Sequence, residues 1–251
     1  MRVLATVIFK GGVGKTSITV NLAHALVKEG KRVLLIDADR QRNTSGLLPT
    51  APAATLYDVI LDNVPLTEAI YEARPNLFLV PSHHKLDTVE KYIALNSIKT
   101  LRLLQRQVQA LTGYDFVLFD TSTAKTALTD AVLLACHEII IPVQLEPYAV
   151  NGLVDAVQTI GETLQELEHT VKITSYIPSN LNYTKGMTQV YLRNLKDTFG
   201  EQVAPPIRTD ANISKAQDKN KTIFEYAPNS KAAHDFTALA THLLISKEVS
   251  V

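Results

Sequence analysis

The chain has 251 residues, of which 46% are apolar and 20% are charged, and its formal net charge is zero. This composition is typical of a globular protein and argues against a chain that is basic all over, while leaving room for a local basic patch. A single cysteine, Cys136, excludes an internal disulfide, and no apolar run reaches the roughly 18 residues that a membrane span needs. No signal peptide precedes the first predicted strand, so we expect a cytoplasmic protein.

The first predicted elements are a buried strand at residues 2–9, a glycine-rich loop at residues 10–16 and a helix at residues 17–28. This order is the context that a phosphate-binding loop requires, because glycines let backbone N–H groups approach an anion at the helix N-terminus. The pattern predicts that Lys15 reaches the β- and γ-phosphates of a nucleotide and that the Thr16 hydroxyl binds Mg²⁺. The predicted nucleotide contacts here are Lys10, Gly11, Gly12, Val13, Gly14, Lys15, Thr16 and Ser17.

A second buried strand, residues 33–37, ends in a carboxylate at the edge where open α/β sheets bind ligands. Residues 38–52 are polar and turn-rich, and we interpret them as a switch segment. A third strand, residues 77–81, is followed by His83 and His84. Adjacent side chains point apart, and no carboxylate or cysteine is spaced with them, so a loop-lining role is favoured over a metal site.

Another buried strand, residues 114–120, ends in Asp120 and resembles a Walker B element, in which an acidic residue holds Mg²⁺, usually through water. The alternation of strands and helices continues without repeats or low-complexity linkers. It predicts one α/β domain over residues 1–251, a doubly wound, mainly parallel sheet with helices on both faces. Other predicted strands are residues 138–142, 171–177 and 203–207. Residues 56–73 are predicted to form short helices broken by Pro65, and the other predicted helices are residues 97–111, 148–168, 183–199, 213–219 and 230–246.

The phosphate loop departs from the general pattern, because Phe9 stands at its first glycine position and Lys10 precedes the glycine pair. In this it resembles the deviant Walker A loop of the ParA/MinD family of P-loop ATPases. The chain is most similar to the ParA/Soj-type members without an N-terminal DNA-binding domain, since the loop starts so early. Further segments that resemble family motifs follow in the family's order: Ile36-Asp37-Ala38-Asp39-Arg40-Gln41-Arg42-Asn43, Asp120-Thr121-Ser122-Thr123, Ile141-Pro142-Val143-Gln144, and residues 146–153 and 207–233.

The resemblance implies an ATPase that uses ATP and Mg²⁺. It implies that Lys10 contacts phosphate across a nucleotide-sandwich homodimer and that Asp39 orients the attacking water. It also implies that Asp37 and Asp120 lie near Mg²⁺ with Thr16, while Lys10, Lys15 and Asp39 are the catalytic set. The adenine is expected against two segments, which contain Pro178, Ser179, Asn180, Ile207 and Arg208.

The family further implies a partitioning ATPase that positions a plasmid, a chromosome or a protein cargo. In the ATP state it would bind nucleoid DNA without sequence preference, and hydrolysis stimulated by a ParB-like or other activator would release it. Basic residues late in the chain are candidates for DNA contact, although acidic residues among them equally suit a solvated mixed-charge surface. These candidates are Lys185, Arg193, Lys196, Lys215, Lys219 and Lys221.

Departures from the family pattern keep two alternatives open. Arg40 and Arg42 replace a proline and a glycine, and Ser122 and Thr123 replace two prolines, which leaves a non-catalytic ATP-binding adaptor as one alternative. A MinD-like membrane ATPase is the other, but residues 239–251 lack the basic face and apolar stripe of an interfacial helix. An iron–sulfur carrier would need paired cysteines, which a single cysteine largely excludes.

Overall fold

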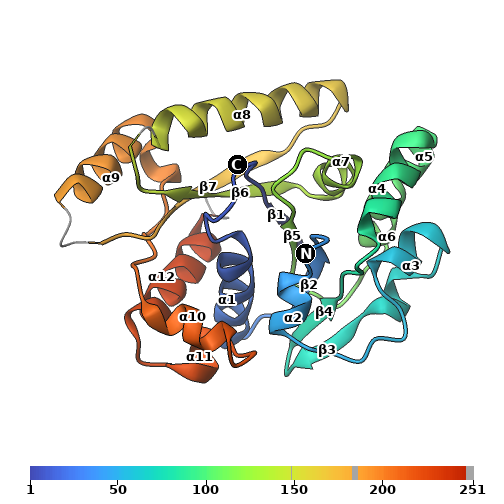
Figure 1. Ribbon diagram of the computed structural model, residues 1–251, viewed down its shortest axis with the longest axis horizontal. Helices are drawn as coiled ribbons and strands as arrows, with labels where there is room; N and C mark the ends of the chain where they lie inside the picture. The colour runs from blue at the N-terminus through green and yellow to red at the C-terminus, as the bar shows by residue number, and fades with distance from the viewer. Residues whose placement is uncertain (148, 183–185, 247–251) are drawn as a thin grey trace.

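A seven-stranded sheet runs through the middle of the molecule (Figure 1). The computed structural model describes residues 1–147, 149–182 and 186–246. Strand order is β3-β4-β2-β5-β1-β6-β7, with β3 antiparallel to β4 and the other neighbouring strands parallel. The strands are β1 (Arg2–Thr6), β2 (Val33–Ala38), β3 (Tyr71–Arg74), β4 (Leu77–Val80), β5 (Phe116–Thr121), β6 (Glu138–Gln144) and β7 (Lys172–Ser179).

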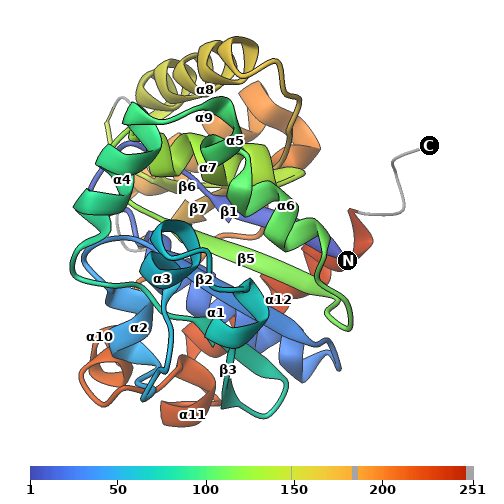
Figure 2. The same cartoon turned by 90° about the vertical axis from the view of Figure 1, so that its right-hand side faces the viewer.

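Helices cover both faces of the sheet, which explains why β1, β2 and β5 are buried along their whole length (Figure 2). On β1, Val3 and Ala5 pack into the core beside α7 and α8, whereas Leu4 packs into the core beside α1 and α12. This confirms the predicted doubly wound α/β fold. The helices are α1 (Lys15–Lys28), α2 (Asn43–Leu47), α3 (Leu56–Leu61), α4 (Leu86–Leu95), α5 (Ile98–Leu101), α6 (Leu103–Gln109), α7 (Ala127–Ala135), α8 (Ala149–Glu166), α9 (Gly186–Phe199), α10 (Ala211–Gln217), α11 (Ile223–Tyr226) and α12 (Lys231–Ile245), with 3-10 turns at Leu66–Ala69 and Gly200–Gln202.

The carboxyl ends of β1, β2 and β5 meet at one edge of the sheet. The pairing of β2 with β5 sets Asp37 beside Asp120, and β1 leads at the same edge into the loop before α1. Parallel strands that end together, with chain connections leaving on both sides, create the crevice where open α/β sheets bind ligands. The fold therefore brings the predicted phosphate loop and both predicted carboxylates together.

The predicted strand at residues 203–207 is wrong. Val203 makes only an isolated bridge, with Tyr176, and no ladder follows it in the described part of the chain. Pro205 and Pro206 explain the difference, because proline has no backbone N–H to donate to a neighbouring strand.

Other differences concern helices and one edge strand. The predicted helix at residues 97–111 is divided into α5 and α6 at Arg102. The sequence analysis did not predict α4, α7 or β3, and it placed the end of the first strand at residue 9 rather than Thr6. The starts predicted for two helices, Tyr148 and Tyr183, lie outside the described residues. Within the residues described, no helix combines the length and apolar character that crossing a membrane requires.

Candidate functional site

The glycine-rich loop adopts a conformation that depends on its glycines. Gly12 and Gly14 have φ angles of 75° and 90°, in the left-handed region that residues with a Cβ rarely occupy. Gly14 is the N-cap of α1, so the helix begins at Lys15 rather than at the predicted Ser17. The helix N-terminus and the loop amides thus surround a concavity suited to an anion.

Lys15 is held at this concavity by the loop itself. Its side chain is only 7% exposed, and Nζ lies 3.3 Å from the Ile8 carbonyl and 3.5 Å from the Lys10 carbonyl. Burial lowers the pKa of Lys15, and the nearby carboxylates of Asp120 and Asp39 oppose that shift. The structure thus places a buried ammonium beside the glycine-rich loop, and its contact with phosphate stays a prediction.

Asp120 offers a carboxylate oxygen that no protein group in the described structure satisfies. Its Oδ2 accepts hydrogen bonds from Thr16 Oγ1 at 2.8 Å and Thr44 Oγ1 at 2.7 Å. Its Oδ1 is buried and has no hydrogen-bond partner among the described residues. Burial raises the pKa of Asp120 to about 6. An orphaned carboxylate oxygen next to a threonine hydroxyl is a set of hard oxygen donors, which fits Mg²⁺.

Asp37 instead organises the segment that follows β2. Its Oδ2 accepts hydrogen bonds from Ser45 N at 2.8 Å and from Ser45 Oγ at 2.5 Å, and its Oδ1 accepts one from Asp39 N at 3.2 Å. Burial and then the charge of Asp120 raise the pKa of Asp37 to about 7. Because both oxygens of Asp37 are used, Asp120 is the better placed of the two to hold a cation.

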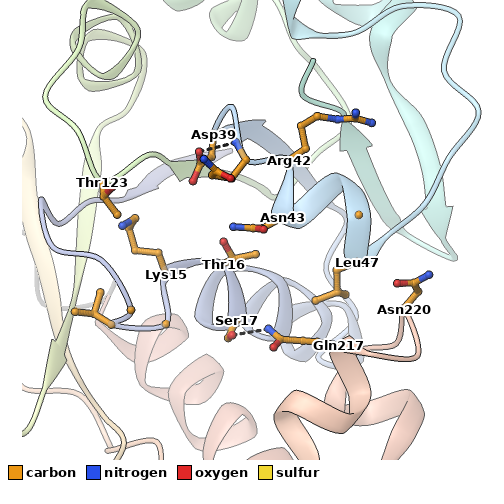
Figure 3. Close-up of a pocket in the computed structure, with 15 residues that line it drawn as sticks. Lys15, Thr16, Ser17, Asp39, Arg42, Asn43, Leu47, Thr123, Gln217 and Asn220 are labelled. Carbon is orange, nitrogen blue, oxygen red and sulfur yellow. Dashed lines mark hydrogen bonds between the residues drawn. The ribbon is translucent and has the colours of Figure 1, made fainter. Parts of the chain in front are cut away.

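Asp39 is fixed in a tight turn that faces the same cavity as Lys15 and Thr16 (Figure 3). Its Oδ1 accepts a hydrogen bond from Gln41 N at 2.9 Å, and its carbonyl accepts one from Arg42 N at 2.9 Å. Arg42 has a φ angle of 57° and caps α2, a left-handed position that favours glycine and costs other residues about 1–2 kcal/mol. The turn therefore stores strain next to the predicted catalytic acid.

Two cavities adjoin at the loop. The first, of about 630 Å³, is lined by residues 12–17, which the sequence analysis assigned to the nucleotide, but not by Asp37 or Asp120, which are fully buried. The second, of about 420 Å³, shares Gly12, Val13, Gly14 and Ser17 with it and extends to the predicted adenine segments. The first cavity is lined by Gly12, Val13, Gly14, Lys15, Thr16, Ser17, Asp39, Gln41, Arg42, Asn43, Gly46, Leu47, Thr123, Gln217 and Asn220.

The predicted adenine residues fall mostly at the second cavity. Ser179, Asn180, Ile207 and Arg208 line it, and Ser179 Oγ donates a hydrogen bond to the Val13 carbonyl at 3.1 Å. Arg208 is held by an ion pair of 2.6 Å with Asp235.

Pro178 differs from the other predicted adenine residues. It lies in β7 and is not among the described residues that line this cavity. Its carbonyl accepts a hydrogen bond from Ile207 N at 2.8 Å, so it supports the turn rather than the cavity surface.

Lys10 does not enter the first cavity. Its side chain is 54% exposed and makes an ion pair with Glu146 of the same chain. The structure thus places Lys10, the lysine predicted to act across a dimer, at the surface beside the loop. It does not line the phosphate cavity of its own chain.

The candidate DNA residues form two separate groups. Arg193 and Lys196 are exposed on α9, whereas Lys215, Lys219 and Lys221 are exposed on α10 and the turn after it. In Figure 1 both helices lie toward the left of the molecule, with α9 above the level of the sheet beside α8 and α10 below it beside α11. Lys185 lies outside the described residues.

Sequence reasoning missed Thr44, Ser45 and Gln217. The two hydroxyls follow the second carboxylate strand closely and open a short helix in a polar segment, a signal that could have identified them. Gln217 comes from far along the chain, and its Nε2 donates a hydrogen bond of 2.6 Å to Ser17 Oγ. Only the fold brings it to the site, so no local pattern could have predicted its contact.

The carboxylate pair predicts a pH-dependent metal affinity. Because the pKa values of Asp37 and Asp120 are raised to about 7 and 6, the metal-free folded chain binds more protons than the unfolded chain above about pH 4. The stability that these bound protons give the folded chain is present at low pH and is lost as pH rises through the folded pKa values of the two carboxyl groups. A cation must displace the bound proton, so Mg²⁺-dependent nucleotide affinity should weaken from pH 8 to pH 5.5, by up to about tenfold per unit for each proton released.

Calorimetry in buffers of different ionisation enthalpy measures this proton release directly. Nucleotide without Mg²⁺ is the control, and its affinity should depend less on pH. An Mg²⁺ contribution that stays constant across this pH range would contradict the assignment of the carboxylates to the metal.

Comparison with known proteins gives a consistent result. A family model described as an AAA domain matches residues 1–173. The chain is 32% identical to the chromosome-partitioning ATPase Soj of Thermus thermophilus, over 94% of this chain and 92% of the relative. It is 29% identical to the chromosome partitioning protein ParA of Caulobacter vibrioides, over 99% of this chain and 95% of the relative.

A solved structure shares the fold along the whole chain. The protein described as cobyrinic acid a,c-diamide synthase of Mycobacterium smegmatis superposes with a TM-score of 0.83 at 25% identity, covering 99% of this chain and 96% of that one. It has been solved with ADP and magnesium bound, and also with an ATP analogue and magnesium bound.

Proposed function

The chain belongs to the family of ParA/Soj-type partitioning ATPases, and we propose that it positions a plasmid, a chromosome or a protein cargo by cycling on and off DNA. Its family consists of P-loop ATPases, and ATP and Mg²⁺ are its cofactors. The observation that carries the proposal is the unsatisfied, fully buried oxygen of Asp120, whose other oxygen bonds Thr16. Thr16 lines the first cavity together with Lys15 and Asp39. Residues 1–251 act as one unit in this proposal.

ATP hydrolysis at this site needs charge neutralisation and positioning more than covalent chemistry. When bound, Mg²⁺ neutralises charge on the β- and γ-phosphates. The Lys15 ammonium, already desolvated, binds the phosphate oxygens, and Thr16 and Asp120 hold the metal. Asp39, fixed by its own turn, orients a water molecule for attack on the γ-phosphate.

A homodimer completes the site in this proposal. Lys10 lies outside the cavity of its own chain and is exposed, which suits a role across a nucleotide-sandwich dimer. Its ion pair with Glu146 must then open or rearrange when a second chain approaches. Resemblance to the family further implies that hydrolysis is slow in the isolated protein and faster with a ParB-like or other activator.

The DNA surface is proposed at α10 and the turn after it, on Lys215, Lys219 and Lys221. These lysines are exposed, and Gln217 and Asn220 from the same segment line the first cavity. A basic surface next to the nucleotide can respond to it, whereas Arg193 and Lys196 are not among the described residues that line either nucleotide cavity. DNA binding in the ATP state would place the protein on the nucleoid.

Binding to a non-specific DNA duplex with ATP, with ADP and without nucleotide tests this function. We expect DNA to bind at least about tenfold more tightly with ATP than with ADP. The reason is that nucleotide binding and DNA binding are coupled in the proposed cycle, so that each changes the affinity for the other. Affinity should fall with rising salt, and each of Lys215→Ala, Lys219→Ala and Lys221→Ala should lower the log–log salt slope by about 1. Fluorescence anisotropy across salt concentrations measures both quantities.

Lys91→Ala, a change of an exposed lysine on α4, is the matched control and should leave the slope unchanged. Binding that is equal in all nucleotide states, or absent from all of them, would contradict the DNA proposal. A slope that responds to Arg193→Ala and Lys196→Ala instead would move the surface to α9.

A further inference from the structure

The turn between α10 and α11 is compact and carries two of the exposed lysines. Lys219 N and Lys221 N both donate hydrogen bonds of 3.0 Å to the Ala216 carbonyl. Asn220 between them has a φ angle of 52°, a left-handed position that asparagine tolerates. Residues 218–221 therefore present Lys219 and Lys221 from one defined backbone shape.

The far end of this turn is anchored to the side of α1. Ile223 N donates a hydrogen bond of 2.7 Å to Asn21 Oδ1, and Thr222 Oγ1 lies 2.7 Å from His24 Nδ1. Neither Asn21 nor His24 is among the described residues that line the two nucleotide cavities. This anchor therefore lies outside both cavities, although Asn21 Nδ2 also donates a hydrogen bond of 2.7 Å to the Ser17 carbonyl.

The near end is anchored inside the nucleotide cavity. Gln217 Nε2 donates a hydrogen bond of 2.6 Å to Ser17 Oγ, and both residues line the first cavity (Figure 3). Ser17 directly follows Thr16, the residue that bonds Asp120, and lies four positions before Asn21 on the same face of α1. Of these anchors on α1, the Ser17–Gln217 contact is the one whose two residues line the first cavity.

We propose that Gln217 is a positioning residue that transmits nucleotide occupancy from Ser17 to the basic turn of residues 218–221. The Gln217 amide has a second hydrogen and a carbonyl oxygen, and a nucleotide in the cavity competes for these groups and for the Ser17 hydroxyl. Because the far anchor lies outside both cavities, a change at Gln217 reorients the turn and its lysines. The regulatory meaning of this change rests on the proposed function, but the change itself does not require DNA.

Hydrogen exchange measured with and without a non-hydrolysable ATP analogue and Mg²⁺ tests the proposal. In the wild-type protein, nucleotide should change exchange at the amides of residues 219–222 by at least about threefold. Gln217→Ala should remove this change. Protection at the phosphate-loop amides in the same experiment verifies that the variant has bound nucleotide.

A second pair of variants separates this role from simple support of the fold. Ser17→Thr keeps the hydroxyl and should keep the response of the turn, whereas Ser17→Ala should lose it. Gln165→Ala, which removes an exposed glutamine on α8, is the matched control and should respond as the wild type does.

The outcomes separate this inference from the proposed function. An equal response of the turn in the wild type and Gln217→Ala, at equal phosphate-loop protection, would overturn the inference. A response that depends on Gln217 in a protein that binds DNA in no nucleotide state would support the inference while contradicting the DNA function.

Discussion

Asp39→Ala is expected to lower the rate of ATP hydrolysis by about 100-fold or more while ATP still binds. Asp39 lies at the cavity wall, with its carbonyl bonded to Arg42 N and Ser82 Oγ, so its backbone is fixed independently of its carboxylate. Loss of the carboxylate removes the group that orients water, but it leaves Lys15 and Thr16 in place. Single-turnover hydrolysis and binding of a fluorescent ATP analogue measure the two effects separately.

Asp39→Asn separates the effect of the negative charge of Asp39 on hydrolysis from its role in holding the turn. Asparagine can still accept the hydrogen bond from Gln41 N, so the turn should persist while hydrolysis is lost. Asp62→Ala, at an exposed aspartate after α3, is the control and should hydrolyse ATP at the wild-type rate. Full ATPase activity in Asp39→Asn would show that the negative charge at this position takes no part in hydrolysis.

The second large effect is expected for Lys15→Ala, which should weaken ATP binding by about 100-fold or more. The Lys15 ammonium is desolvated and stands beside Asp120 and Asp39, so its removal leaves negative charge uncompensated where phosphate must bind. Wild-type protein at an ATP concentration of about 100 times Kd gains about 2.7 kcal/mol of stability from the ligand. The variant should lose nearly all of this gain, which thermal unfolding with and without Mg²⁺ and ATP measures.

The matched control for this measurement is Lys91→Ala, which removes an exposed lysine far from the loop in sequence. It should show the same ligand-induced rise in Tm as the wild type. If Lys15→Ala retained that rise, the phosphate contact would have to come from another residue, and the assignment of the loop would be wrong.

The central strands and the phosphate loop could be predicted from the sequence because their signals are local. Strands β1, β2 and β5 are short apolar runs with polar or glycine boundaries, which is typical of parallel strands buried on both faces. Helix α7 lacks such a signal, since seven of its nine residues are buried and it shows no polar face. Strand β3, at the sheet edge, has no buried residue in its four and so shows no apolar pattern.

The residues of the site also fall into two groups, those that local motifs predict and those whose contacts depend on the fold. Lys15, Thr16, Asp39 and Asp120 belong to short motifs, so the sequence predicts them. The fold brings the first three to one cavity and sets Asp120 behind it, bonded to Thr16. The ion pair of Lys10 with Glu146 joins residues 136 positions apart. Such contacts follow from strand order and helix packing, which no local pattern encodes.

The position of β1 in the sheet also has a consequence for how the protein is made. This strand is synthesised early, but its neighbours are β5 and β6, and Arg2 bonds Glu138 across 136 residues of chain. A nascent chain therefore exposes an apolar strand until β5 (Phe116–Thr121) has also left the ribosome, and closing so long a loop slows folding. Because the phosphate loop follows β1 directly, its place at the sheet edge depends on the same long-range closure.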